Sequence, residues 1–142
     1  MKKIITSLFL TAICLLLLSS HQFPAEWNTV FENEDVKIEY QTQNCDDLVN
    51  DIRNNYNILK VTNKTDKEVQ LSFLRKAWYN TKCYGCDNQE EHTVRITLQP
   101  RQVVSGSCTR EISGLQIYHS NNSGLIEPLE RFELTSIKTS KN

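Results

Sequence analysis

The sequence predicts an all-β fold, namely an antiparallel β-sandwich of about seven short strands. Several segments alternate apolar and polar residues with a period of two, and Val36 to Gln43 and Thr93 to Gln99 are the clearest. This alternation is typical of strands in antiparallel sheets with one solvated face. Turn residues separate the segments at close intervals. The chain shows no alternation of strands with helices and no internal repeat, so a parallel sheet is not expected.

Residues 1–22 have the layout of a secretory signal peptide. Lys2 and Lys3 precede an apolar run that ends at Leu18, and small residues for cleavage follow at Ser19 and Ser20. The run is shorter than the roughly 20 residues that a membrane-spanning helix needs. We therefore expect a periplasmic or secreted protein with no membrane span once the signal is removed.

The charge of the mature chain argues against a nucleic-acid partner. The full sequence has 16 basic and 17 acidic residues. Loss of Lys2 and Lys3 leaves 14 basic residues against the same 17 acidic ones, for a net charge of −3. A nucleic-acid-binding protein would carry a basic face, and no basic cluster longer than Arg75-Lys76 is present.

After the signal, we expect an N-terminal arm at 23–35 and one β-sandwich domain at 36–142. The central feature of that domain is the segment from Ile58 to Phe73, in which two apolar runs flank a polar turn at Asn63 to Lys67. This pattern predicts a β-hairpin. The polar segment from Asn44 to Asn55 is expected to be a loop or one short helical turn. Further strands are expected at Val103–Cys108, Leu115–Tyr118 and Phe132–Ile137, with a frayed polar tail after the last.

Four cysteines remain in the mature chain, namely Cys45, Cys83, Cys86 and Cys108. An even number in an exported chain is typical of disulfides. Cys83 and Cys86 are close by necessity, which favours a Cys83–Cys86 bond and leaves Cys45 for Cys108. A bond that closes the longer loop could stabilise the fold by about 4 kcal/mol in the chain-entropy account, which is disputed.

Two other interpretations of the Cys83-Tyr84-Gly85-Cys86 motif stay open. It could be a redox-active dithiol with a lowered thiol pKa, although it lacks the strand-into-helix setting of such pairs. It could also contribute to a metal site, in which Cys83 and Cys86 are joined by His92 and an acid such as Asp87. The metal interpretation lacks a second closely spaced ligand pair. No cofactor is expected in the structural interpretation.

Trp78, Tyr79 and Tyr84 lie close together in the sequence beside this motif. They could be core aromatics at the edge of a sheet, since such residues bury large areas in small domains. Alternatively, they form a binding surface for a glycan or a peptide. These three residues are therefore the candidate binding residues.

The sequence offers no catalytic motif. It contains no G-x-S-x-G elbow, no H-E-x-x-H helix and no glycine-rich phosphate loop. We name no catalytic residue and expect a non-enzymatic protein, with an unidentified protein or glycan of the cell envelope as its partner.

The segments LKVTNKTDKEVQLSF, WYNTKCYGCDN and ITLQPRQVVSGSC, together with the short Lys-rich signal, resemble small exported proteins of Bacteroidetes-type bacteria. The resemblance covers Val36 to the C-terminus. It implies an immunoglobulin-like β-sandwich and an exported location, but no activity. Trp78 lies much farther from Cys45 than the core tryptophan of an antibody domain lies from its first cysteine, so only the broader architecture carries over.

Overall fold

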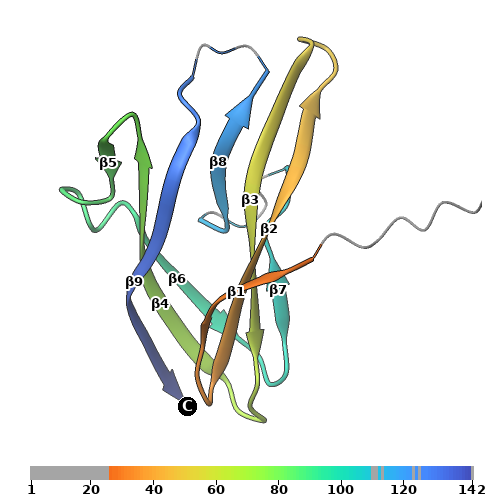
Figure 1. Ribbon diagram of the computed structural model, residues 1–142. Coiled ribbons are helices and arrows are strands. Elements are labelled where there is room, and N and C mark those ends of the chain that lie inside the picture. Colours follow the sequence, from red (N-terminus) through yellow and green to blue (C-terminus); the bar gives the residue numbers. More distant parts are fainter. Residues whose placement is uncertain (1–25, 110–111, 113, 123, 125, 142) are drawn as a thin grey trace, which may run out of the picture.

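The computed structural model describes residues 26–109, 112, 114–122, 124 and 126–141. The proposed signal peptide lies outside the described residues. The described chain is all-β and forms two antiparallel sheets (Figure 1), which confirms the predicted structural class. None of the described residues belongs to a helix long and apolar enough to cross a membrane.

The first sheet, sheet A, has five strands. Its strands are β1 (Asn28–Glu32), β2 (Val36–Asp47), β3 (Ile52–Asn63), β7 (Val103–Ser105) and β8 (Gln116–Asn121). β2 lies between β1 and β3, and β7 and β8 both pair with β3, one after the other along its length.

The second sheet, sheet B, has four strands. Its strands are β4 (Val69–Tyr79), β5 (Lys82–Tyr84), β6 (Thr93–Leu98) and β9 (Leu129–Lys141). β4 is the common neighbour: it pairs with β9 along its whole length, with β6 over its first half and with β5 at its end.

One hydrophobic cluster contains residues of both sheets. Sheet A contributes alternate residues of β2 and β3, and sheet B contributes alternate residues of β4 and β6, as the period of two in the sequence predicts. Fully or almost fully buried members are Val36, Ile38, Leu59, Val61, Val69, Leu71, Phe73, Val94, Leu98, Leu115 and Ile117. The two sheets are therefore held together by their inner faces.

The predicted hairpin at Ile58 to Phe73 is wrong. β3 and β4 do not pair with each other but belong to different sheets, so their connection crosses from sheet A to sheet B. The side chain of Asn63, which is 1% exposed, holds this connection. Its Nδ2 donates to the carbonyl oxygens of Lys67, Leu98 and Gln99, and its Oδ1 accepts from the backbone N–H and the hydroxyl of Thr65. The alternation in the sequence marks two strands but not which sheet each one joins.

Two further expectations are corrected, one for the segment from Asn44 to Asn55 and one for the C-terminal tail. Most of the segment from Asn44 to Asn55 is strand, because β2 and β3 pair as far as Asp47 and Ile52, and only residues 48–51 form the turn between them. The described part of the arm expected at 23–35 contains a strand, β1, whose Phe31 packs against the core. The tail is not frayed, since β9 continues to Lys141. The polar composition of these segments reflects exposure at the ends of the sheets.

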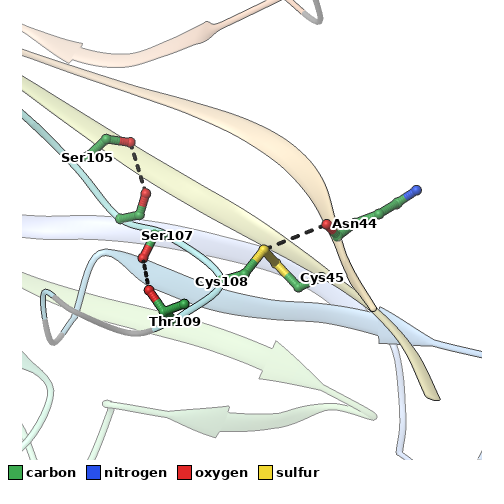
Figure 2. The surroundings of a disulfide bond; sticks show 7 residues. Asn44, Cys45, Ser105, Ser107, Cys108 and Thr109 are labelled. Atoms are coloured by element: carbon green, nitrogen blue, oxygen red, sulfur yellow. Dashed lines mark hydrogen bonds between the residues drawn. A yellow bond between two sulfur atoms is a disulfide. The ribbon is translucent and has the colours of Figure 1, made fainter. Parts of the chain in front are cut away.

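Both expected disulfides are present, Cys45–Cys108 and Cys83–Cys86. Figure 2 shows the first, which ties the segment after β7 to β2 with a Cα–Cα distance of 5.4 Å. The Cys108 Sγ also lies 3.6 Å from the carbonyl oxygen of Asn44. Because β2 and β7 do not pair with each other, this bond links segments that the backbone hydrogen bonds leave separate.

Candidate functional site

The candidate site begins where the apolar core ends, along the inner face of β4. Val69, Leu71 and Phe73 on this face are buried in the core. The same face continues with Arg75, Ala77 and Tyr79, because side chains on a strand alternate between its faces. Sheet B therefore places a guanidinium and a phenol between the two sheets, opposite β8.

A two-residue turn at Asn80 and Thr81 brings β5 back alongside β4. Both residues have positive φ, 46° and 66°, which is the backbone of a type I′ hairpin turn. Threonine rarely adopts this conformation because it is β-branched, so the turn is strained. The Thr81 N–H donates to Glu130 Oε1 at 3.1 Å. The turn places Tyr84 opposite Ala77 and beside Tyr79.

Gly85 follows with φ of 87° and lies against β4. A Cβ at this position would collide with the carbonyl oxygen of Arg75. Only glycine permits this close approach. The Cys83–Cys86 bond then closes the loop around it, with a Cα–Cα distance of 5.8 Å. The disulfide thus fixes the short loop that contains Tyr84 and Gly85.

Four tyrosine rings form a chain from sheet A to β5. Tyr56 meets Tyr118 at a centroid distance of 5.7 Å, Tyr118 meets Tyr79 at 6.1 Å, and Tyr79 meets Tyr84 at 5.5 Å. The Tyr79 hydroxyl donates to the carbonyl oxygen of Tyr118 at 2.7 Å. This bond and the ring contacts connect β4 to β8 across the gap between the sheets.

Two cavities share Tyr79, Tyr84 and Tyr118 as lining residues. We call the two together the tyrosine pocket. The larger cavity has a volume of about 600 Å³ and is also lined by Asn80, Lys82, Ile126 and Glu127. The smaller cavity has a volume of about 220 Å³ and is also lined by Arg75, Ala77, His92, Gln116 and Ile117. Tyr84 and Ile126 are 45% and 54% exposed, so the larger cavity presents apolar surface to solvent.

Burial perturbs the ionisable groups of the pocket. It lowers the pKa of the Arg75 guanidinium, which nevertheless stays charged because arginine does not deprotonate in proteins. Burial raises the pKa of Tyr79 to about 12, although the nearby Arg75 acts in the opposite direction. Burial and the neighbouring Tyr56 also raise the pKa of Tyr118. At neutral pH the smaller cavity is therefore lined by the Arg75 cation and the protonated phenols of Tyr79 and Tyr118.

The structure brings together two of the three candidate binding residues. Tyr79 and Tyr84 share the pocket, whereas Trp78 lies on the opposite face of β4. There the Arg131 guanidinium covers the Trp78 ring at 3.8 Å. Sequence reasoning missed Arg75 and Tyr118. The period of two extended through β4 could have found Arg75, but nothing in the sequence indicates that Tyr118 faces β4.

The residues of the alternative metal site, Cys83, Cys86 and His92, do not form a metal-binding group. Cys83 and Cys86 are bonded to each other, and a disulfide offers no thiolate to a metal. His92 lines the smaller cavity instead. Within the described part of the chain, no three side chains of histidine, cysteine, aspartate or glutamate, Asp87 included, are grouped to hold a metal ion.

Comparison with protein-family models, with curated proteins and with solved structures finds no match for this chain.

Proposed function

We propose that this protein is a non-enzymatic binding module of the cell envelope, exported to the periplasm or the medium, and that the tyrosine pocket is its ligand surface. The proposed ligand is a glycan or protein of the envelope. The observation that carries the proposal is the convergence of Tyr79, Tyr84 and Tyr118 around two cavities that share them as lining residues. Binding sites are typically concave and aromatic, with a few polar groups that orient the ligand.

The cysteines support the exported location, because disulfides form and persist outside the reducing cytosol. The two sheets with a common core support the finer proposal of an immunoglobulin-like β-sandwich, as does the resemblance to exported Bacteroidetes-type proteins. On such frameworks, ligand sites lie where loops and strand ends meet at one end of the sheets. The tyrosine pocket has this position, at the ends of β4 and β8.

Fluorine NMR tests this proposal directly. The chain has five tyrosines, so the oxidised protein labelled with 3-fluorotyrosine should give five resonances, assigned by single Tyr→Phe variants. Soluble envelope polysaccharide and envelope peptide fractions are then added. We expect the resonances of Tyr79, Tyr84 and Tyr118 to shift, and that of Tyr40, which packs against Phe132, to stay.

Two results would contradict the proposal. One is that no envelope fraction moves the three pocket resonances while the protein is folded. The other is a change in the ligand itself, seen as new carbohydrate or peptide fragments, which would indicate an enzyme. Location is tested separately by N-terminal sequencing of the cell-free and periplasmic protein, which should begin between Ser20 and Phe23.

A further inference from the structure

Residues that line the smaller cavity of the tyrosine pocket carry hydrogen-bond donors with no acceptor among the described residues. Buried side-chain atoms without a hydrogen-bond partner include Arg75 Nε, Gln116 Nε2 and the Tyr118 hydroxyl. All three residues line this one cavity. Buried polar groups are almost always hydrogen-bonded, so unsatisfied groups gathered around one cavity call for an explanation.

Arg75 also lacks an ionic partner. No ion pair between described residues involves Arg75, and the described lining of the smaller cavity contains no carboxylate. Among the described residues, the one hydrogen bond of the Arg75 side chain runs from Nη1 to the carbonyl oxygen of Gln116 at 2.7 Å. This bond fixes the plane of the guanidinium. A buried charge that is not paired is unfavourable, and an anion that reached it would relieve that penalty.

The geometry of the donors suits a carboxylate. The Nε edge of a guanidinium presents two parallel N–H groups, which bind both oxygens of one carboxylate. A phenol hydroxyl and an amide NH₂ can donate to the remaining lone pairs. A volume of about 220 Å³ accommodates a carboxylate and part of the ring that carries it.

The larger cavity indicates what carries the carboxylate. Tyr79 and Tyr84 meet edge to face and line both cavities, so an aromatic wall runs from the cation to the open surface. Such a wall can pack against the apolar face of a sugar ring. Asn80, Lys82 and Glu127 around the larger cavity supply donors and acceptors for ring hydroxyls.

We propose that the tyrosine pocket binds an acidic saccharide, with the carboxylate of a uronic acid on Arg75, Gln116 and Tyr118 and the sugar ring on Tyr79 and Tyr84. This inference rests on the proposed function and gives it a ligand class. In this proposal the side chain of Tyr84, which is 45% exposed and lines both cavities, rotates to let the ligand pass from the larger cavity to the smaller one.

The test is calorimetric titration of the oxidised protein with three probes. These are an oligogalacturonide, the same oligosaccharide with its carboxyl groups reduced to alcohols, and an acidic peptide. We expect the oligogalacturonide to bind at least tenfold more tightly than the reduced oligosaccharide and than the peptide. Added salt should weaken the binding, because the contact with Arg75 is ionic.

Matched variants locate the contact. Arg75→Gln should weaken oligogalacturonide binding at least tenfold, whereas Arg131→Gln, which changes the arginine on the opposite face of β4, should not. Tyr118→Phe removes an unpartnered donor, so it should weaken binding several-fold without lowering the melting temperature of the free protein. If these donors had a purely structural role, the Arg75→Gln and Tyr118→Phe variants would melt at a lower temperature and would bind the oligogalacturonide with unchanged affinity.

The possible failures are distinguishable. Equal binding of the acidic and the reduced oligosaccharide, unaffected by Arg75→Gln, would overturn the carboxylate inference and leave the proposed binding function standing. Tighter binding of the acidic peptide would overturn the saccharide assignment. Failure of all three probes to bind would overturn the inference, and the fluorine NMR experiment on envelope fractions would then decide the proposed function independently.

Discussion

Substitution of Asn63 by alanine should destabilise the protein several times more than substitution of Asn55, which lies on the same strand. The side chain of Asn63 makes five hydrogen bonds at the crossing from β3 to β4, with donor–acceptor distances from 2.8 to 3.3 Å. At roughly 1 kcal/mol net for each bond, and less for the long one to Leu98, the loss is about 4 kcal/mol. The carbonyl oxygens of Lys67 and Gln99 keep a second donor, from the Thr65 hydroxyl and the Gln102 N–H, so this loss counts only the bonds of Asn63 itself.

Asn55→Ala is the matched control. Asn55 is on the same strand, and its Nδ2 donates one bond, to Ser120 Oγ at 3.1 Å, so the expected loss is about 1 kcal/mol. Urea unfolding of the oxidised proteins, followed by tryptophan fluorescence, gives both values if the slope with denaturant is unchanged. If Asn63→Ala and Asn55→Ala lose the same free energy of unfolding, Asn63 does not hold the crossing between the sheets.

Three other predictions concern the disulfides and two ionisable groups. The Cys45–Cys108 bond joins residues 63 positions apart, so its loss through a double Cys→Ser change should lower the free energy of unfolding by about 4 kcal/mol in the chain-entropy account. The loss for Cys83–Cys86 should be about 2 kcal/mol. Equal losses in urea unfolding would contradict this account. Glu39 is 8% exposed. Its burial raises the pKa of the carboxyl group, but the hydrogen bonds from Lys37 and Lys60 together have the larger effect and hold the pKa below its ordinary value. The stabilisation by Glu39 is therefore present above the ordinary pKa of about 4.3 and lost as the pH falls through the lowered value, and Glu39→Gln should flatten this part of the stability–pH curve. Burial of Tyr79 raises its pKa to about 12, so its stabilisation is complete below about pH 10 and lost towards pH 12; ultraviolet titration should show an ionisation near pH 12 that Tyr79→Phe abolishes.

The strand positions could be predicted from the sequence because the core residues alternate on β2, β3, β4 and β6. The partners of each strand could not, because the same alternation suits any neighbour with an apolar face. The connection from Asn63 to Val69 has a length that fits a hairpin equally well. What separates β3 from β4 is the set of bonds from Asn63 to the segment at 98–99, and these long-range contacts have no local signature.

The candidate site was predictable only where its parts are neighbours in the sequence. Tyr79 and Tyr84 flank a turn and a disulfide, so a common surface could be expected. Tyr118 and Gln116 come from β8 in the other sheet and join the pocket only because the two sheets pack together. Arg75 has the wrong polarity for its inward-facing position, and this conflict with the strand pattern was the available signal of a functional group.

Non-reducing peptide mapping of the native protein tests the central claim most directly, namely that the four cysteines of the mature chain are paired as structural cross-links and hold no metal ion. We expect two linked peptide products, Cys45–Cys108 and Cys83–Cys86, and an intact mass four hydrogens below that of the reduced chain. Free thiols at Cys83 and Cys86, or a metal ion that remains bound to them in native mass spectrometry, would contradict the account.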